Sequence, residues 1–165
     1  MPEIINKSHR ESAAAGRDRA GSIRIAMFTP MEPLKSGVAW YSLKILQGLV
    51  KKRPGVDIDV YIDDGYRPDD IGLDKVRFLN HGLFHENKDL YHAVLYEFGN
   101  NYEFHSYMLP YIHAYGGIVE FHDINTSGIY AKIIKQLADH LKKLRFIRFI
   151  TTLAVYPELR FYLWY

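Results

Sequence analysis

The 165-residue chain contains no cysteine and no long uncharged apolar segment. Without cysteine it can form neither a disulfide bond nor a thiolate metal site. No apolar run approaches the roughly 20 residues of a membrane-spanning helix, and the first residues lack the apolar core of a secretory signal peptide. Charge is nearly balanced, with a formal net charge of +2 and 24% charged residues, which gives no indication of a nucleic-acid partner.

Motifs of several enzyme classes are missing too. Neither the dinucleotide-binding pattern GxGxxG nor the P-loop pattern GxxxxGK[ST] occurs, and there is no HExxH zinc motif. His81 and His85 are four residues apart, which suits metal ligation only on a helix, and their surroundings lack helical periodicity. We therefore predict a site without a metal ion and without a bound cofactor.

The residues that are present favour one α/β domain. Apolar residues make up 48% of the chain, enough to form the core of a single domain. Residues 1–22 are polar and rich in Ala, Gly and Ser, so we predict a disordered leader followed by a domain over 23–165. Apolar and β-branched runs predict strands near 23–29, 56–62, 75–80, 92–98 and 117–122.

Helical periodicity occurs between most of these predicted strands. It runs from Val38 to Arg53, where Pro54 and Gly55 end it, and again over 102–115, where we expect Pro110 to kink or end the helix. A last helix carries one apolar face, formed by Tyr130, Ile133, Ile134, Leu137, Leu141 and Leu144. Alternating strands and helices predict right-handed βαβ units, hence a Rossmann-like parallel sheet with helices on both faces.

Polar or glycine-bearing loops follow three of the predicted strands. Ser36-Gly37 follows the first strand, Gly99-Asn100-Asn101 the fourth, and His122-Asp123 the fifth. The carboxyl ends of parallel strands meet at one edge of the sheet, where open α/β folds bind ligands. We therefore expect the three loops to share one site.

Each loop also has a purely structural interpretation. Ser36 and Gly37 can begin a helix or receive a phosphate at its N-terminus. Asn100 and Asn101 can form a turn or bind sugar hydroxyl groups. His122 can be satisfied by a backbone carbonyl with Asp123 capping the next helix, or it can place a titratable group in the site. The residues alone leave both interpretations open.

Taken in their order along the chain, four pieces of the sequence resemble the N-terminal domain of retaining GT-B glycosyltransferases of family four. "FTPMEPLKSGVAWYSLKILQGL" resembles the family's first strand, glycine loop and first helix, and "LYEFGNNYEFHSYM" is similar to its tyrosine–glycine–asparagine loop. "GGIVEFHD" is similar to the strand "PGVVVLHD", and "YPELRFYL" (156–163) is faintly similar to "YPLNRYVL". The first loop has one glycine where many relatives have two, and Gly116 replaces the family's proline.

The resemblance implies an activity and a set of roles. The reaction would transfer a sugar from a nucleotide diphosphate sugar to a saccharide or lipid-linked acceptor, with retention and without metal. Ser36 and Gly37 would contact the diphosphate of the donor, and His122 and Asp123 would form the catalytic pair. Asn100, Asn101 and His105 would shape the acceptor side.

The resemblance also implies a second Rossmann domain that would close over the donor, and the chain ends before one. We therefore expect a cytoplasmic glycosyltransferase fragment that is inactive alone. The alternatives are a non-catalytic α/β binding module and a domain that lies on a membrane surface. For the latter, basic residues Lys142, Lys143, Arg145 and Arg148 alternate with apolar ones near the end of the chain. The apolar side chains in 144–164, including Phe146, Phe149, Phe161 and Trp164, predict self-association once exposed.

Overall fold

The computed structural model describes residues 22–155, with side chains described as far as residue 145. The predicted leader up to residue 21 and the segment 156–163 therefore lie outside the described residues. So do the side chains of Arg148, Phe146, Phe149, Phe161 and Trp164, on which the membrane-surface and self-association predictions partly rest. Within the described residues, ten helices and strands and three short 3-10 turns follow one another: β1 (Ile23–Phe28), α2 (Gly37–Lys52), β2 (Val56–Ile62), β3 (Val76–Asn80), η1 (His81–Leu83), α3 (Phe84–Asn87), η2 (Lys88–Leu90), β4 (Ala93–Phe98), α4 (Tyr102–His105), η3 (Ser106–Met108), α5 (Leu109–Tyr115), β5 (Ile118–Phe121) and α6 (Ser127–Val155).

The five strands form one parallel sheet in the order β3-β2-β1-β4-β5. This confirms the predicted Rossmann-like α/β class. From β1 the chain adds β2 and β3 on one side and then β4 and β5 on the other, so the strand order reverses between β1 and β4. Open α/β sheets bind ligands at such a position. The loops after β1, β4 and β5 therefore emerge side by side.

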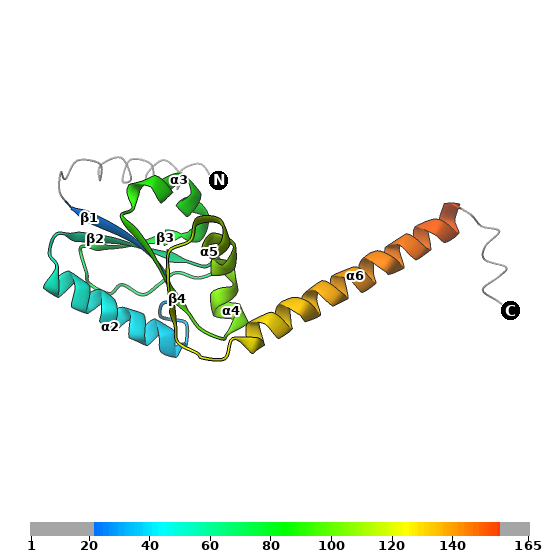
Figure 1. The fold of residues 1–165 in the computed structure, drawn as a ribbon, viewed down its shortest axis with the longest axis horizontal. Coiled ribbons are helices and arrows are strands. Elements are labelled where there is room, and N and C mark those ends of the chain that lie inside the picture. The colour runs from blue at the N-terminus through cyan, green and yellow to red at the C-terminus, as the bar shows by residue number, and fades with distance from the viewer. Residues whose placement is uncertain (1–21, 156–165) are drawn as a thin grey trace.

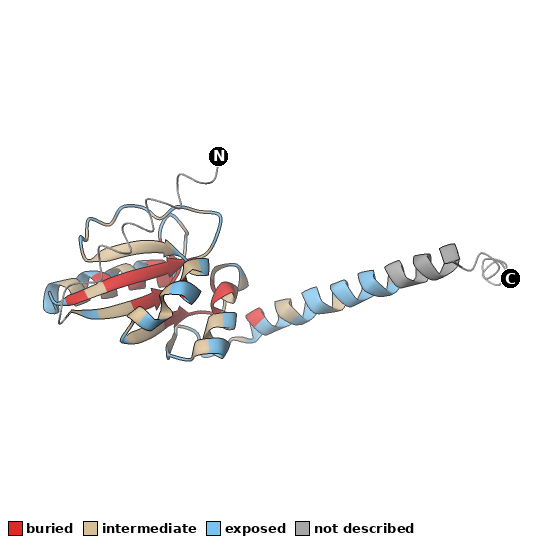
Figure 2. Cartoon of the chain, turned by 90° about the horizontal axis from the view of Figure 1, so that it is seen from above, coloured by how far each residue is buried: buried red, intermediate tan, exposed pale blue. Residues whose placement is uncertain are grey.

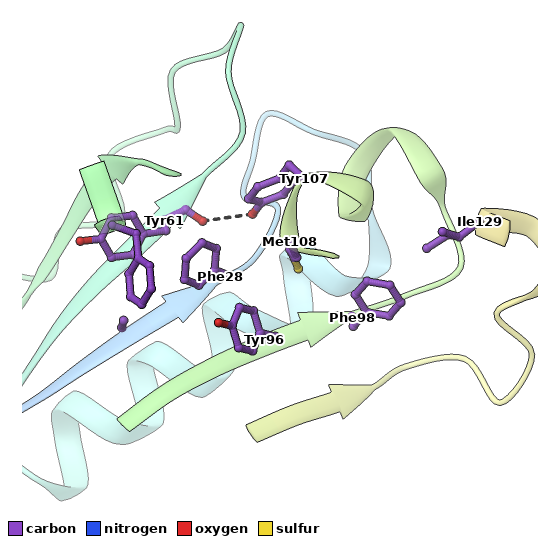
Figure 3. Packing of buried hydrophobic residues seen from close by; sticks show 9 residues of the cluster. Phe28, Tyr61, Tyr96, Phe98, Tyr107, Met108 and Ile129 are labelled. Atoms are coloured by element: carbon purple, nitrogen blue, oxygen red, sulfur yellow. Dashed lines mark hydrogen bonds between the residues drawn. The ribbon is translucent and has the colours of Figure 1, made fainter. Parts of the chain in front are cut away.

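Helices cover both faces of the sheet, because alternate side chains of each strand point to opposite faces. On one face Leu46 of α2 packs in a cluster with Met27, Met31, Val56, Ile58, Val60 and Ile62. On the other face α3, η3 and α5 pack against an aromatic cluster. Figure 3 shows Phe28 between Tyr61 and Tyr96, with ring centroids 5.1 and 4.9 Å away, and the Tyr107 hydroxyl donating to the Tyr61 carbonyl at 3.0 Å.

The predicted helix over 102–115 is interrupted at 106–108, before the expected position at Pro110. It consists of α4, the turn η3 and α5, and Pro110 lies in the first turn of α5. The N–H that proline lacks has no partner within the helix at that position, so Pro110 fits the start of a helix. The expected break in this helix is present, but it lies at 106–108, and Pro110 begins the second helix instead of ending the first.

The last helix, α6, projects away from the sheet (Figures 1 and 2). Its first turns contact α4, where Ile129 is buried, the Tyr102 hydroxyl donates to Gln136 at 2.6 Å, and Lys132 pairs with Glu103. Most of the predicted apolar face is nevertheless exposed, with Ile134 at 65% and Leu137 at 59%. The periodicity of α6 was predicted, but of this face only Ile133 packs against the core among the described residues, and the remaining side chains are exposed. None of the described helices has both the length and the apolar character needed to cross a bilayer.

Candidate functional site

One cavity of about 440 Å³ lies at the carboxyl edge of the sheet, among the loops after β1, β4 and β5. Lys35, Val38 and Phe104 help to line it. Its lining also includes all seven residues singled out from the sequence, which are Ser36, Gly37, Asn100, Asn101, His105, His122 and Asp123. The parallel order of β1, β4 and β5 brings these three separate loops together.

The first wall of the cavity is the N-terminus of α2. Ser36 is the N-cap, and its hydroxyl accepts a hydrogen bond from the Val38 N–H at 3.2 Å. A Cβ atom added at Gly37 would meet nothing within 4 Å, so the backbone here is open on the cavity side. The positive end of a 16-residue helix, together with Lys35, gives this wall the polarity that suits an anion.

The Asn100–Asn101 loop is held by hydrogen bonds to the protein itself. The Asn100 N–H donates to the Asp123 carboxylate at 2.6 Å, and the Asn100 side-chain oxygen accepts from the Gly128 N–H at 2.9 Å. Asn101 caps α4 by accepting from the Glu103 N–H at 2.9 Å. Asp123 thus holds the loop after β4 in place through this hydrogen bond, and Asn100 caps the N-terminus of α6. These contacts fix the second wall of the cavity.

His105 lies beneath the same loop and is 1% exposed. A Cβ atom at Gly99 would approach its Nε2 atom to 2.9 Å and the Asp123 carboxylate to 3.2 Å, so only glycine fits there without movement. Burial lowers the pKa of His105 to about 4, although a hydrogen bond to the backbone of Glu97 opposes this shift. The ring is therefore neutral near pH 7, and its burial suits supporting the loop more than binding an acceptor directly.

His122 has a carboxylate partner that the sequence interpretation did not anticipate. Its Nε2 atom lies 2.6 Å from the Oε2 atom of Glu97, and its ring meets the edge of Tyr41 with centroids 4.8 Å apart. The Tyr41 hydroxyl in turn donates to Glu120 at 2.7 Å. The structural alternative, in which a backbone carbonyl satisfies His122, is not what the geometry shows.

Glu97 is a site residue that the sequence analysis missed. The Glu97 side chain is 0% exposed, and burial raises the pKa of this carboxyl group. The hydrogen bond from His122 and the charge of His122 lower the same pKa. A signal was present, because the segments "LYEF" and "IVEF" each place a glutamate inside an otherwise apolar strand. Such a residue must find a partner in the core, since an unpaired buried carboxylate is costly.

A larger cavity of about 1360 Å³ opens at the ends of β2 and β3. Acidic residues dominate its polar lining, with Arg67 the one Lys or Arg among the described lining residues; the acids are Asp63, Asp64, Asp69 and Asp70. This charge opposes an anionic ligand, so the smaller cavity is the better candidate for a phosphate-bearing one.

No family profile, curated protein or solved structure matches this chain significantly. The glycosyltransferase resemblance and the residue roles that it implies therefore stay predictions. The Rossmann-like fold is shown by the parallel five-stranded sheet, independently of any such match.

Proposed function

We propose that the smaller cavity is the donor half of a glycosyltransferase site that uses a nucleotide diphosphate sugar. One observation carries the proposal: loops after three different strands, each singled out from the sequence, line a single cavity. In the proposed complex the diphosphate lies at the N-terminus of α2, against Ser36 and Gly37, where backbone N–H groups and the helix dipole favour negative charge.

The proposed role of His122 follows from where charge develops during transfer. Breaking the glycosidic bond of the donor places positive charge on the sugar ring and negative charge on the departing diphosphate. The buried Glu97 carboxylate orients the His122 ring and fixes which nitrogen carries the proton. His122 would then act on the reacting sugar, and Asp123 would hold the Asn100 loop beside it.

Binding of the donor can be tested by isothermal titration of the chain with UDP-glucose and GDP-mannose. We expect millimolar affinity, because Lys35 is the one Lys or Arg among the described residues that line the cavity. Gly37→Val should weaken binding about tenfold or more, since its side chain would stand where the phosphate approaches open backbone. Gly55→Val is the matched control, because a Cβ at Gly55 also meets nothing within 4 Å but lies outside the cavity.

The catalytic part of the proposal concerns His122. In a preparation that transfers sugar, His122→Ala should lower kcat by roughly 100-fold or more with donor affinity changed less than about threefold, because the contact strengthens in the transition state. The exposed His113→Ala is the control. Equal, mild effects of His122→Ala and Gly37→Val would favour the other candidate, a non-catalytic binding module.

A further inference from the structure

Two glutamates and a histidine meet on the face of β4 and β5 that also carries α2. Glu97 and Glu120 are direct partners in the parallel register, and His122 follows Glu120 by two residues, so all three side chains point to the same face. One ligand atom from each residue lies within 4.8 Å of the other two. Three groups that commonly bind metal ions are therefore brought within reach of one centre.

Glu97 is the incompletely satisfied member of this group. Its side chain is fully buried, its Oε2 atom bonds His122, and its Oε1 atom has no hydrogen-bond partner among the described residues. A buried carboxylate oxygen without a partner is costly, and such an atom in a native structure calls for an explanation such as a bound ion. Glu120 adds a second carboxylate beside it, so one histidine cannot neutralise both acids.

We propose that Glu97, Glu120 and His122 form a binding site for a divalent cation of the zinc type. Zn²⁺ accepts imidazole nitrogen and carboxylate oxygen at about 2.0–2.2 Å and is often held by three protein ligands with a fourth position open. Two ligands at that distance in tetrahedral geometry lie about 3.4 Å apart. The 2.6 Å separation of His122 Nε2 and Glu97 Oε2 therefore has to widen by less than about 1 Å.

Tyr41 supports the site from outside. Its hydroxyl donates to Glu120, and that hydrogen bond is the main reason why the pKa of Tyr41 is raised. Hydrogen bonds of this kind orient the carboxylates that bind metals. Because His122 also lines the smaller cavity, a cation held there would add positive charge to the wall of that cavity.

The cation site goes beyond the proposed function and does not depend on it. Zinc at Nε2 would replace the hydrogen bond between His122 and Glu97 and leave the His122 proton on Nδ1. The cation site also departs from the sequence-based expectation of a site without metal, which rested on the absence of cysteine and of known zinc motifs and on histidine spacing along the chain. A chain that binds the cation but no nucleotide sugar would leave this inference standing, and the reverse result would leave the proposed transfer standing.

A second group of similar composition provides a matched control. Asp63, Asp64 and His81 also bring ligand atoms within 4.8 Å of one another, but the Asp64 side chain is 74% exposed and His81 Nδ1 bonds the Tyr111 hydroxyl at 2.8 Å. No buried oxygen without a partner belongs to this group among the described residues. We propose no site there, and Asp64→Asn tests whether binding occurs there instead.

The experiment is a calorimetric titration of the whole chain, freed of metal with a chelator and of any affinity tag, with ZnCl₂ near pH 7. We expect one site of micromolar affinity, weakened at least tenfold in Glu120→Gln and unchanged in Asp64→Asn. Glu120 is only partly buried, so Glu120→Gln should keep the fold, and circular dichroism checks this. Absence of any zinc binding below about 1 mM, or loss of the site in Asp64→Asn alone, would overturn the proposal.

A second measurement avoids variants altogether. Long-range ¹H–¹⁵N spectra of the imidazole groups should show the His122 resonances shifting on addition of one equivalent of zinc, with those of His81 unchanged. Shifts confined to His81, or to histidines outside the cluster, would also overturn the proposal.

Discussion

His105 and His122 lie at the same cavity in opposite surroundings. His105 is buried, and its pKa is lowered to about 4, so it stays neutral across the physiological range. His122 is partly exposed and pairs with the Glu97 carboxylate. The two histidines therefore differ in their surroundings, because His105 is buried away from water and His122 faces the Glu97 carboxylate.

The buried His105 should make folding stability depend on pH. Between about pH 6.5 and 4 the unfolded chain binds a proton at this residue and the folded chain does not, so the free energy of unfolding falls as the pH falls. Below about pH 4 the loss amounts to roughly 3 kcal/mol, and above 6.5 it vanishes. Urea unfolding of wild type and His105→Gln across this range measures the difference.

The control for this measurement is His113→Gln, because His113 is exposed. Glu97 contributes with the opposite sign, since a raised carboxyl pKa lowers stability as the pH rises above its ordinary range, but it is present in both proteins and cancels. Wild-type and His105→Gln curves that run parallel from pH 7 to 4 would contradict the prediction.

At the scale of elements, the junction between α5 and β5 depends on two glycines. Gly116 has φ 65° with ψ −160°, and Gly117 has φ 131°; both lie in regions that other residues rarely adopt. Gly117 also lies against β4, where an added Cβ would meet the Val94 carbonyl oxygen at 2.8 Å. This close approach lets β5 pair with β4, which sets the positions of Glu120 and His122.

Substitutions at this junction should be graded. Gly116→Ala should lower the free energy of unfolding by about 1–3 kcal/mol through backbone strain alone. Gly117→Ala should cost more, because strain combines with a backbone clash that cannot relax by rotating a side chain. Gly55→Ala, with no positive φ and no nearby atom, should change stability by less than about 0.5 kcal/mol. Chemical denaturation measures all three, and equal costs at Gly116 and Gly117 would contradict the clash.

At the scale of the whole molecule, α6 leaves a large apolar surface uncovered. Exposed residues recur at alternating intervals of four and three along it, at Tyr130, Ile134, Leu137, Leu141 and Leu144. Figure 2 shows this helix mostly exposed beyond its first two turns, as far as it is coloured. An apolar stripe of this kind is a surface that favours association.

We therefore expect the chain to self-associate through α6. Leu137→Glu should shift the protein toward monomer, raising the dissociation constant at least tenfold, because it places a charge in the middle of the apolar stripe. Lys135→Glu, on the opposite side of the same helix, should have little effect. Sedimentation velocity over a range of concentrations measures both, and a wild-type chain that is monomeric at high micromolar concentration would contradict the prediction.

The sequence alone determined the strands, their alternation with helices and the edge of the sheet where the loops meet. Short-range periodicity and turn residues predict the strands and helices, and the right-handed connection of βαβ units then predicts how the strands are arranged in the sheet. For the same reason the sequence predicts that the loops at Ser36, Asn100 and His122 lie together, as the cavity confirms. Their chemical roles could not, because a cap and a ligand contact use the same residue types.

The tertiary structure alone decided which charges face each other. The meeting of Glu97 with His122, and of both with Glu120, depends on the register between β4 and β5, and a shift of one residue would turn these side chains to the other face. The burial of His105 and the exposure of α6 likewise depend on what packs above them. Pairing and burial depend on residues that are far apart in the chain, so local periodicity cannot predict them.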